Sequence, residues 1–139
     1  NQMRQYRPAQ AGCGLLDFQD AVAGPATYDL MSLLEDARRD VDPLMAERLK
    51  QRWLAAAAPS LDRVSFEASW AVLAAQRHAK VVGIFTRLAR RDGKPGYLVH
   101  IPRVWRLLER ALAHPALARL AAWLEEEVPP GSRVVPTAS

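Results

Sequence analysis

The chain has 139 residues, half of them hydrophobic, which is enough apolar material for one domain with a packed core. Its formal charge is +4, but residues 1–42 hold four basic and seven acidic side chains, so the basic excess lies on the later part. No aromatic residue interleaves the densest basic run, at residues 87–94, which favours a solvated helix face and predicts no nucleic-acid partner.

The single cysteine, Cys13, excludes an internal disulfide and leaves no Cys-based zinc site. No apolar stretch approaches the ~20 residues that a helix needs to cross a bilayer, so no membrane partner is predicted. A reducing cytoplasm is therefore the expected compartment.

The first predicted element is a short buried β-strand at residues 14–18, which delivers Asp17 near its end. A carboxylate in that position can leave the core and bind Mg²⁺ that bridges nucleotide phosphates. Asp20 follows in the next turn, where it can accept backbone N–H groups and brace the local geometry. The pattern therefore predicts a metal ligand followed by a structural acid.

Gly24-Pro25 breaks the backbone before a first helix, whose apolar positions at residues 30–37 follow helical spacing. Glu35 is predicted to face water from the opposite side of this helix. Asp29, near the helix start, is predicted to be a structural brace. Its carboxylate would either cap its own helix or fasten a neighbouring loop by accepting backbone N–H groups.

Two further helices follow in the pattern. Asp42-Pro43 predicts the start of a helix that runs to about Ala58. The longest helix is predicted from a cap at Ser65 to Arg91, and Gly93 is placed to end it in a left-handed turn.

Arg77 is a charged residue on the apolar stripe of this longest helix. An unpaired guanidinium there would cost on the order of several kcal/mol. We therefore interpret Arg77 as a structural brace in a buried ion pair, with an Asp of the first helix or of the metal-site loop. Direct contact with substrate or phosphate is the alternative. The neighbouring His78 is predicted to pack in the core or at its rim.

Helical patterning resumes with Pro102 near a helix start, and Pro115 opens a last helix. The positions predicted to face inward are Val104, Leu107, Leu108, Ala111 and Leu112 on the first of these helices, and Leu117, Leu120, Ala121 and Leu124 on the second. Residues 1–128 are thus predicted to form one unit, a metal-binding strand and about five helices. Residues 129–139, rich in Pro, Gly, Ser and Thr, are predicted to be a flexible tail. The fold class is mainly α, of the α+β type, with a short β-strand or hairpin at the N-terminus.

Several short motifs occur in one order along the chain: DFQDA, YDL, QRHAK, GIF, RDGK and IPRVW. In these motifs the chain resembles the aminoglycoside phosphotransferase-like kinases. Within them it is most similar to the bacterial kinases that phosphorylate the anomeric hydroxyl of N-acetylmuramate and N-acetylglucosamine. The resemblance covers most of the chain and implies the helical C-terminal lobe of a protein-kinase-like fold.

The resemblance implies ATP as co-substrate and Mg²⁺ held by Asp17, with Asn1 at the position of a second ligand. Related kinases can place another acidic ligand two residues after the first, where this chain has Gln19. Whether Gln19 or Asp20 touches the metal therefore stays open. The implied reaction is phosphoryl transfer to a small hydroxyl acceptor, an amino sugar in cell-wall recycling, although the family alone does not fix the acceptor.

The same resemblance implies that the nucleotide lobe and the catalytic base would precede residue 1. No catalytic residue is therefore assigned within this chain, which is expected to be inactive alone. Apolar surface left bare by a missing lobe would favour a homodimer or a domain swap. The alternative function is a non-catalytic helical interaction module on a kinase-like scaffold, which would not respond to Mg²⁺ or ATP.

Overall fold

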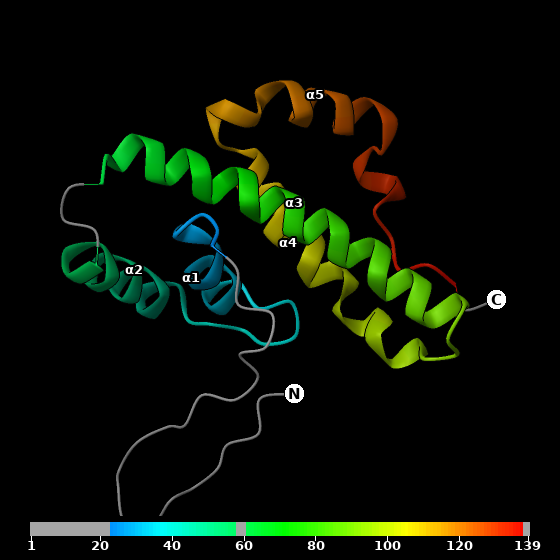
Figure 1. The fold of residues 1–139 in the computed structure, drawn as a ribbon. Helices are drawn as coiled ribbons and strands as arrows, with labels where there is room; N and C mark the ends of the chain where they lie inside the picture. Colours follow the sequence, from blue (N-terminus) through cyan, green and yellow to red (C-terminus); the bar gives the residue numbers. More distant parts are fainter. Residues whose placement is uncertain (1–22, 58–60, 138–139) are drawn as a thin grey trace, which may run out of the picture.

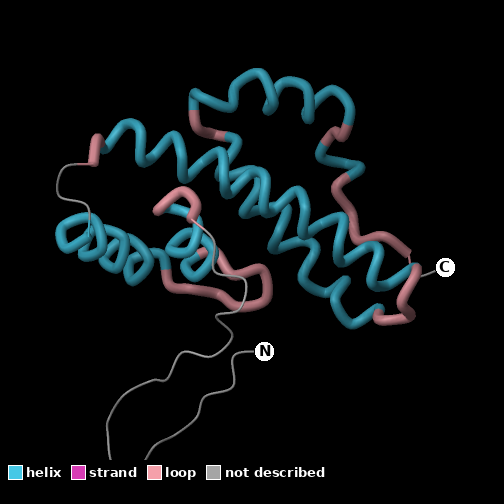
Figure 2. The backbone as a smooth tube through the Cα atoms, viewed as in Figure 1, coloured by secondary structure: helices cyan, strands magenta, loops and turns pink. Residues whose placement is uncertain are grey.

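The structure, a computed structural model, describes residues 23–57 and 61–137. Within these two ranges the chain is helical and carries no strand (Figure 2). The described α-helices are α1 (Thr27–Leu34), α2 (Pro43–Ala57), α3 (Arg63–Arg90), α4 (Ile101–Leu112) and α5 (Ala118–Glu127). The mainly α prediction is confirmed, while the strand predicted at residues 14–18 lies outside the described residues.

Helix α3 is the longest element, and the other helices are arranged around it (Figure 1). The chain reverses after α3, and α4 then runs back along it. Helix α1 packs against α3, while α5 follows α4 after a 3-10 turn, η2 (Pro115–Leu117). In the described part of the chain, no helix combines the length and the apolar surface that crossing a membrane requires.

The reversal between α3 and α4 depends on Gly93, whose φ is 64°. In this left-handed conformation the backbone N–H of Lys94 reaches back to the carbonyl oxygen of Leu88, at 2.9 Å. A side chain with a Cβ is disfavoured at such a φ, so glycine stands where the turn needs it. The chain then enters the 3-10 turn η1 (Pro95–His100) and α4. The predicted left-handed turn is confirmed.

The core consists of two hydrophobic clusters along the α3 and α4 pair. The first joins α1, α3, α4 and η2 through Met31, Ala71, Ala74, Ala75, Leu108, Ala111, Leu112 and Leu117. The second lies toward the reversal and contains Ala37, Phe85, Ala89, Leu98, Ile101 and Val104. The alanines of α3 allow its backbone to approach its neighbours closely, and every apolar position predicted inward on α4 is buried.

The N-terminal cap predicted for α2 is confirmed, whereas the one predicted for α3 is wrong. Asp42 caps α2, because its Oδ1 accepts a hydrogen bond from the backbone N–H of Met45 at 2.9 Å. The cap of α3 is Asp62 and not Ser65: Asp62 Oδ2 accepts from the backbone N–H of Ser65 at 2.8 Å. Ser65 is the donor of the capping bond because it lies three residues inside.

Helix α5 buries less surface than its sequence pattern predicts. Leu120 was expected to face inward but is 42% exposed, and Trp123 is 55% exposed. Pro115 begins the 3-10 turn, so α5 itself starts only at Ala118. The helix thus lies at the edge of the fold, with Ala121 and Leu124 partly buried against the first cluster.

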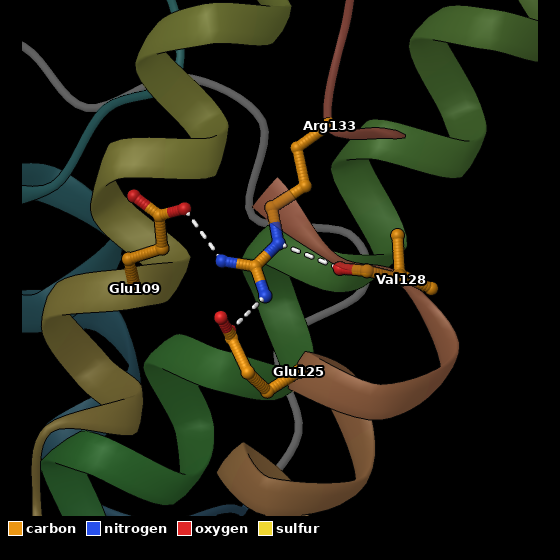
Figure 3. Close-up of polar contacts among 4 residues, drawn as sticks. All are labelled: Glu109, Glu125, Val128 and Arg133. Carbon is orange, nitrogen blue, oxygen red and sulfur yellow. Dashed lines mark hydrogen bonds and ion pairs between the residues drawn. The ribbon is translucent and has the colours of Figure 1, made fainter. Parts of the chain in front are cut away.

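The segment after α5 is held by Arg133, which follows the 3-10 turn η3 (Pro130–Ser132) (Figure 3). Its guanidinium donates to Glu109 Oε1 of α4 at 2.8 Å, to Glu125 Oε2 of α5 at 2.6 Å, and to the Val128 carbonyl oxygen at 2.8 Å. The hydrogen bond to Glu109, with the one to Glu125, raises the pKa of Arg133 although burial opposes this. The boundary predicted at residue 128 stays a prediction, but these contacts restrain the first part of the segment beyond it.

Replacing Arg133 by Ala is expected to loosen this segment, because three hydrogen bonds disappear together. The two glutamates are substantially exposed, so water compensates part of the loss, and a local cost of roughly 1–2 kcal/mol is expected. Hydrogen exchange of residues 128–137 in the intact protein should then accelerate about tenfold. Arg119→Ala, an exposed arginine on α5, is the matched control, and equal exchange in both variants would contradict the restraint.

Candidate functional site

Three predicted site residues, Asn1, Asp17 and Asp20, lie outside the described residues, so their roles remain predictions. Among residues 23–57 and 61–137, no group of three or more His, Cys, Asp or Glu side chains could hold a metal ion. The predicted magnesium ligands, Asn1 and Asp17, are not among these residues. The described residues show instead how the helix that follows the predicted metal segment is held in place.

Asp29 lies in the first turn of α1 and is exposed. The residue at the N-cap position is Ala26, and no side chain caps the helix. Of the two braces predicted for Asp29, the cap of its own helix is therefore not formed. The other, a bond to a neighbouring loop, stays a prediction. Its negative charge is also favourable where it lies, because the N-terminus of a helix is the positive end of its dipole.

Two contacts fasten α1 to α3 next to Asp29. Arg77 Nη1 donates to the hydroxyl oxygen of Tyr28 at 3.2 Å, and the guanidinium carbon lies 5.8 Å from the centre of the Tyr28 ring. The hydroxyl oxygens of Thr27 and Ser69 lie 2.9 Å apart, within hydrogen-bond distance. The start of α1 is therefore tied to α3 at two points.

The partner of Arg77 is thus a phenol, where a carboxylate was predicted. No ion pair of Arg77 is formed with the described residues, and its Nε is buried without a hydrogen-bond partner among them. The contact with Tyr28 links two helices, which is the position that a structural brace requires. The role itself stays a prediction.

A buried polar cluster of Glu35, Trp70 and His78 was not predicted. Glu35 was expected to face water, which is wrong: its side chain is 16% exposed. Glu35 Oε1 accepts from Trp70 Nε1 at 2.9 Å, and Glu35 Oε2 lies 2.7 Å from Nε2 of His78, which is fully buried. His78 packs in the core, as expected. An ionised carboxylate only accepts, so Nε2 of His78 carries the hydrogen.

Two opposing effects act on the pKa of Glu35. Burial alone would raise it, because the charged form loses water. The hydrogen bonds from His78 and Trp70, together with the charges of His78 and Arg110, outweigh burial and lower the pKa of Glu35 below its ordinary value of 4.5. Glu35 is therefore ionised at neutral pH, and its negative charge is balanced within the protein.

A cleft of about 230 Å³ lies beside Glu35, between the α1–α2 connection, α2, α3 and α4. Its lining is strongly charged. The basic side chains are Arg39, Lys50, Arg103, Arg106 and Arg110, and the acidic ones are Glu35, Asp36, Asp40 and Glu47. Such a lining suits a small, polar ligand. The sequence could have revealed part of it, because three of the arginines follow helical spacing on α4.

Comparisons with known proteins agree with the motifs. Residues 6–66 match the model of the APH, or phosphotransferase enzyme, family. A protein of Caulobacter vibrioides named N-acetylmuramate/N-acetylglucosamine kinase is 46% identical over 127 residues, which are 91% of this chain and 35% of that protein. Proteins of the same name from Pseudomonas aeruginosa and Neisseria meningitidis are 40% and 42% identical, over 87% and 83% of this chain. The chain spans little more than a third of the length of these relatives.

Proposed function

We propose that this chain, which belongs to the phosphotransferase enzyme family, is the helical C-terminal part of an ATP- and Mg²⁺-dependent kinase that phosphorylates an amino sugar. One observation carries the proposal: relatives named N-acetylmuramate/N-acetylglucosamine kinase align with most of this chain at 36–46% identity. N-acetylmuramate and N-acetylglucosamine are therefore the proposed acceptors. Such a kinase would act in the cytoplasm, where ATP is available.

In this proposal Asp17 and Asn1 hold Mg²⁺. Their side chains offer carboxylate and amide oxygens, the ligands that this hard cation prefers. When bound, the ion neutralises charge on the phosphoryl group that is transferred. Asp17 itself would bind and orient the donor, and Asp20 would shape the turn that follows.

The described helices would act by positioning. Eight residues, 19–26, separate the predicted strand from α1, so the placement of α1 limits where that strand can end. The Arg77–Tyr28 and Thr27–Ser69 contacts fasten α1 to the long helix α3. Asp29, exposed at the start of α1, is free to brace a loop outside the described residues. We assign no catalytic base to this chain, and we expect it to be inactive without the remainder of the kinase.

The proposal is tested by the thermal stability of the intact protein with and without Mg²⁺ and ATP. A ligand that binds only the folded state raises the melting temperature, so an increase of several degrees is expected at saturating nucleotide. Asp17→Ala should abolish the increase, whereas Asp92→Ala, a change of the same kind at an exposed turn, should preserve it. Indifference of the unchanged protein to nucleotide would favour a non-catalytic helical module instead.

A further inference from the structure

A row of arginines runs along the edge of α4 that borders the cleft. Arg103, Arg106 and Arg110 are spaced by three and four residues, which places them on one side of a helix. Like charges at these spacings repel each other and disfavour the helix. The opposite side of α4 is buried in the core, so the row cannot turn away from the cleft. A bound anion would relieve this repulsion.

The acidic side chains of the cleft already form hydrogen bonds or ion pairs, one of them with an arginine of the row itself. Glu35 binds His78 and Trp70, and Asp40 pairs with Arg103. Glu47 accepts a hydrogen bond from Gln51 of its own helix, and Asp36 accepts one from the backbone N–H of Arg38. The charge of Glu35 also interacts with that of Arg110, but among the described residues no acid of the cleft forms an ion pair with Arg39, Arg106 or Arg110.

Three guanidinium groups lack a partner of this kind. Among the described residues, no hydrogen bond or ion pair is formed by Arg39, Arg106 or Arg110. In addition, Nη1 of Arg103 is buried and has no hydrogen-bond partner among them. A buried N–H donor without an acceptor is costly, and Arg103 lines the same cleft, so an anion bound there would offer this atom an acceptor.

We propose that this cleft binds the carboxylate of an acidic sugar acceptor, with Arg106 and Arg110 as the principal ligands. The proposal rests on the proposed function, because it names the feature of the acceptor that the site reads. N-acetylmuramate carries a carboxylate that N-acetylglucosamine lacks. The planar guanidinium fork matches two carboxylate oxygens, so arginines select such a group over a neutral substituent.

The size of the cleft agrees with this occupant. Its volume of about 230 Å³ lies below the roughly 300–1,000 Å³ of pockets for drug-sized ligands, which is suitable for a sugar ring or its charged substituent. Trp70 also lines the cleft, close to the Glu35 carboxylate. In this proposal the cleft holds the acidic substituent, and the rest of the kinase acts on the reacting hydroxyl.

The test measures binding of the two sugars to the intact protein by calorimetric titration without ATP. The unchanged protein should bind N-acetylmuramate more tightly than N-acetylglucosamine. Arg106→Gln and Arg110→Gln should each lower the affinity for N-acetylmuramate about tenfold, because one charge-assisted contact is lost. The affinity for N-acetylglucosamine should stay within twofold of that of the unchanged protein. Arg119→Gln on α5 removes the same charge away from the cleft and should change neither sugar.

The neutral sugar also reports whether a variant is correctly folded. The proposal would be overturned if the variants bound both sugars equally more weakly, or if they bound the acidic sugar as tightly as the unchanged protein does. The proposal would also be overturned if Arg106→Gln lost binding of ATP or inorganic phosphate but bound N-acetylmuramate as before. The arginines would then be ligands of phosphate groups and not of the sugar carboxylate. Arginine-dependent binding of the acidic sugar without any phosphoryl transfer from ATP would refute the proposed function and leave the cleft assignment standing.

Discussion

Replacing Asp17 by Ala in the intact protein is expected to lower turnover of the amino sugar by about a thousandfold or more. The reason is that Asp17 is proposed to supply the charged oxygen ligand of Mg²⁺, and positioning with charge neutralisation is most of what a protein contributes to phosphoryl transfer. Folding should be nearly unaffected, because a metal ligand at the end of the predicted strand would add little to the core. Steady-state rates and melting temperature measured on the same sample separate the two effects.

Asp20→Ala is the variant to compare with Asp17→Ala, because it separates a structural role from a metal-binding one. Asp20 is proposed to shape the turn, so its loss should lower the melting temperature along with turnover and leave the response to Mg²⁺ concentration unchanged. Asp92→Ala controls for removal of a surface carboxylate. Turnover of Asp17→Ala within tenfold of the unchanged protein would remove Asp17 from the metal site, and the kinase proposal would lose its principal residue.

The second large effect is expected when Glu35 is replaced by Ala, which should lower the stability of the folded protein. Glu35→Ala leaves the Trp70 and His78 ring N–H donors without the carboxylate that now accepts from both. Because His78 is fully buried and water cannot readily replace the acceptor, the free energy of unfolding should fall by about 3 kcal/mol. Chemical denaturation of the intact protein measures it, with Glu126→Ala on the exposed side of α5 as the matched control. Glu35→Gln, which keeps an acceptor, should lose less.

The same residue predicts a pH dependence. The folded state lowers the pKa of Glu35 below 4.5, so the unfolded state binds a proton more readily. The stability from this group is therefore fully present above about pH 4.5 and is lost as the pH falls through the lower, folded pKa. The stability difference between the unchanged protein and Glu35→Ala should shrink over that acidic window. A difference that stays constant would show that the hydrogen bonds do not depend on the charge.

The sequence predicted those parts of the fold that depend on regular helical spacing. On α4 the apolar residues recur every three or four positions, and Val104, Leu107, Leu108, Ala111 and Leu112 are all buried as expected. Gly93 was also predicted correctly, because few residues other than glycine adopt its φ readily.

The errors occur where helical spacing stops applying. Helix α1 ends at Leu34, and Glu35 is its C-cap with φ −115° and ψ 50°, so a helical projection assigns its side chain to the wrong face. Ser65 was mistaken for a cap because Asp62, which has the same preference, lies three residues earlier. The predicted carboxylate partner of Arg77 was wrong because its partner, the Tyr28 hydroxyl, lies on another helix. Spacing within one helix carries no information about such contacts.

For the candidate site, too, local sequence predicted some residues and missed what depends on contacts between elements. Asp17, Asn1 and Asp20 were proposed from local sequence and resemblance, and their chemistry needs partners outside the described residues. The arginine row of the cleft was visible as spacing on α4, but its significance was not. Only the folded chain brings Arg39, from the α1–α2 connection, to the same cleft as Arg106 and Arg110.

Trp105 packs against both hydrophobic clusters, and the Arg133 guanidinium lies 5.8 Å from the centre of its ring. One indole thus joins the end of the fold near α1, the reversal at Gly93 and the segment after α5. Loosening any of these regions changes the surroundings of the same side chain. Helices α1, α3 and α4 and the segment after α5 are therefore expected to melt as one cooperative unit.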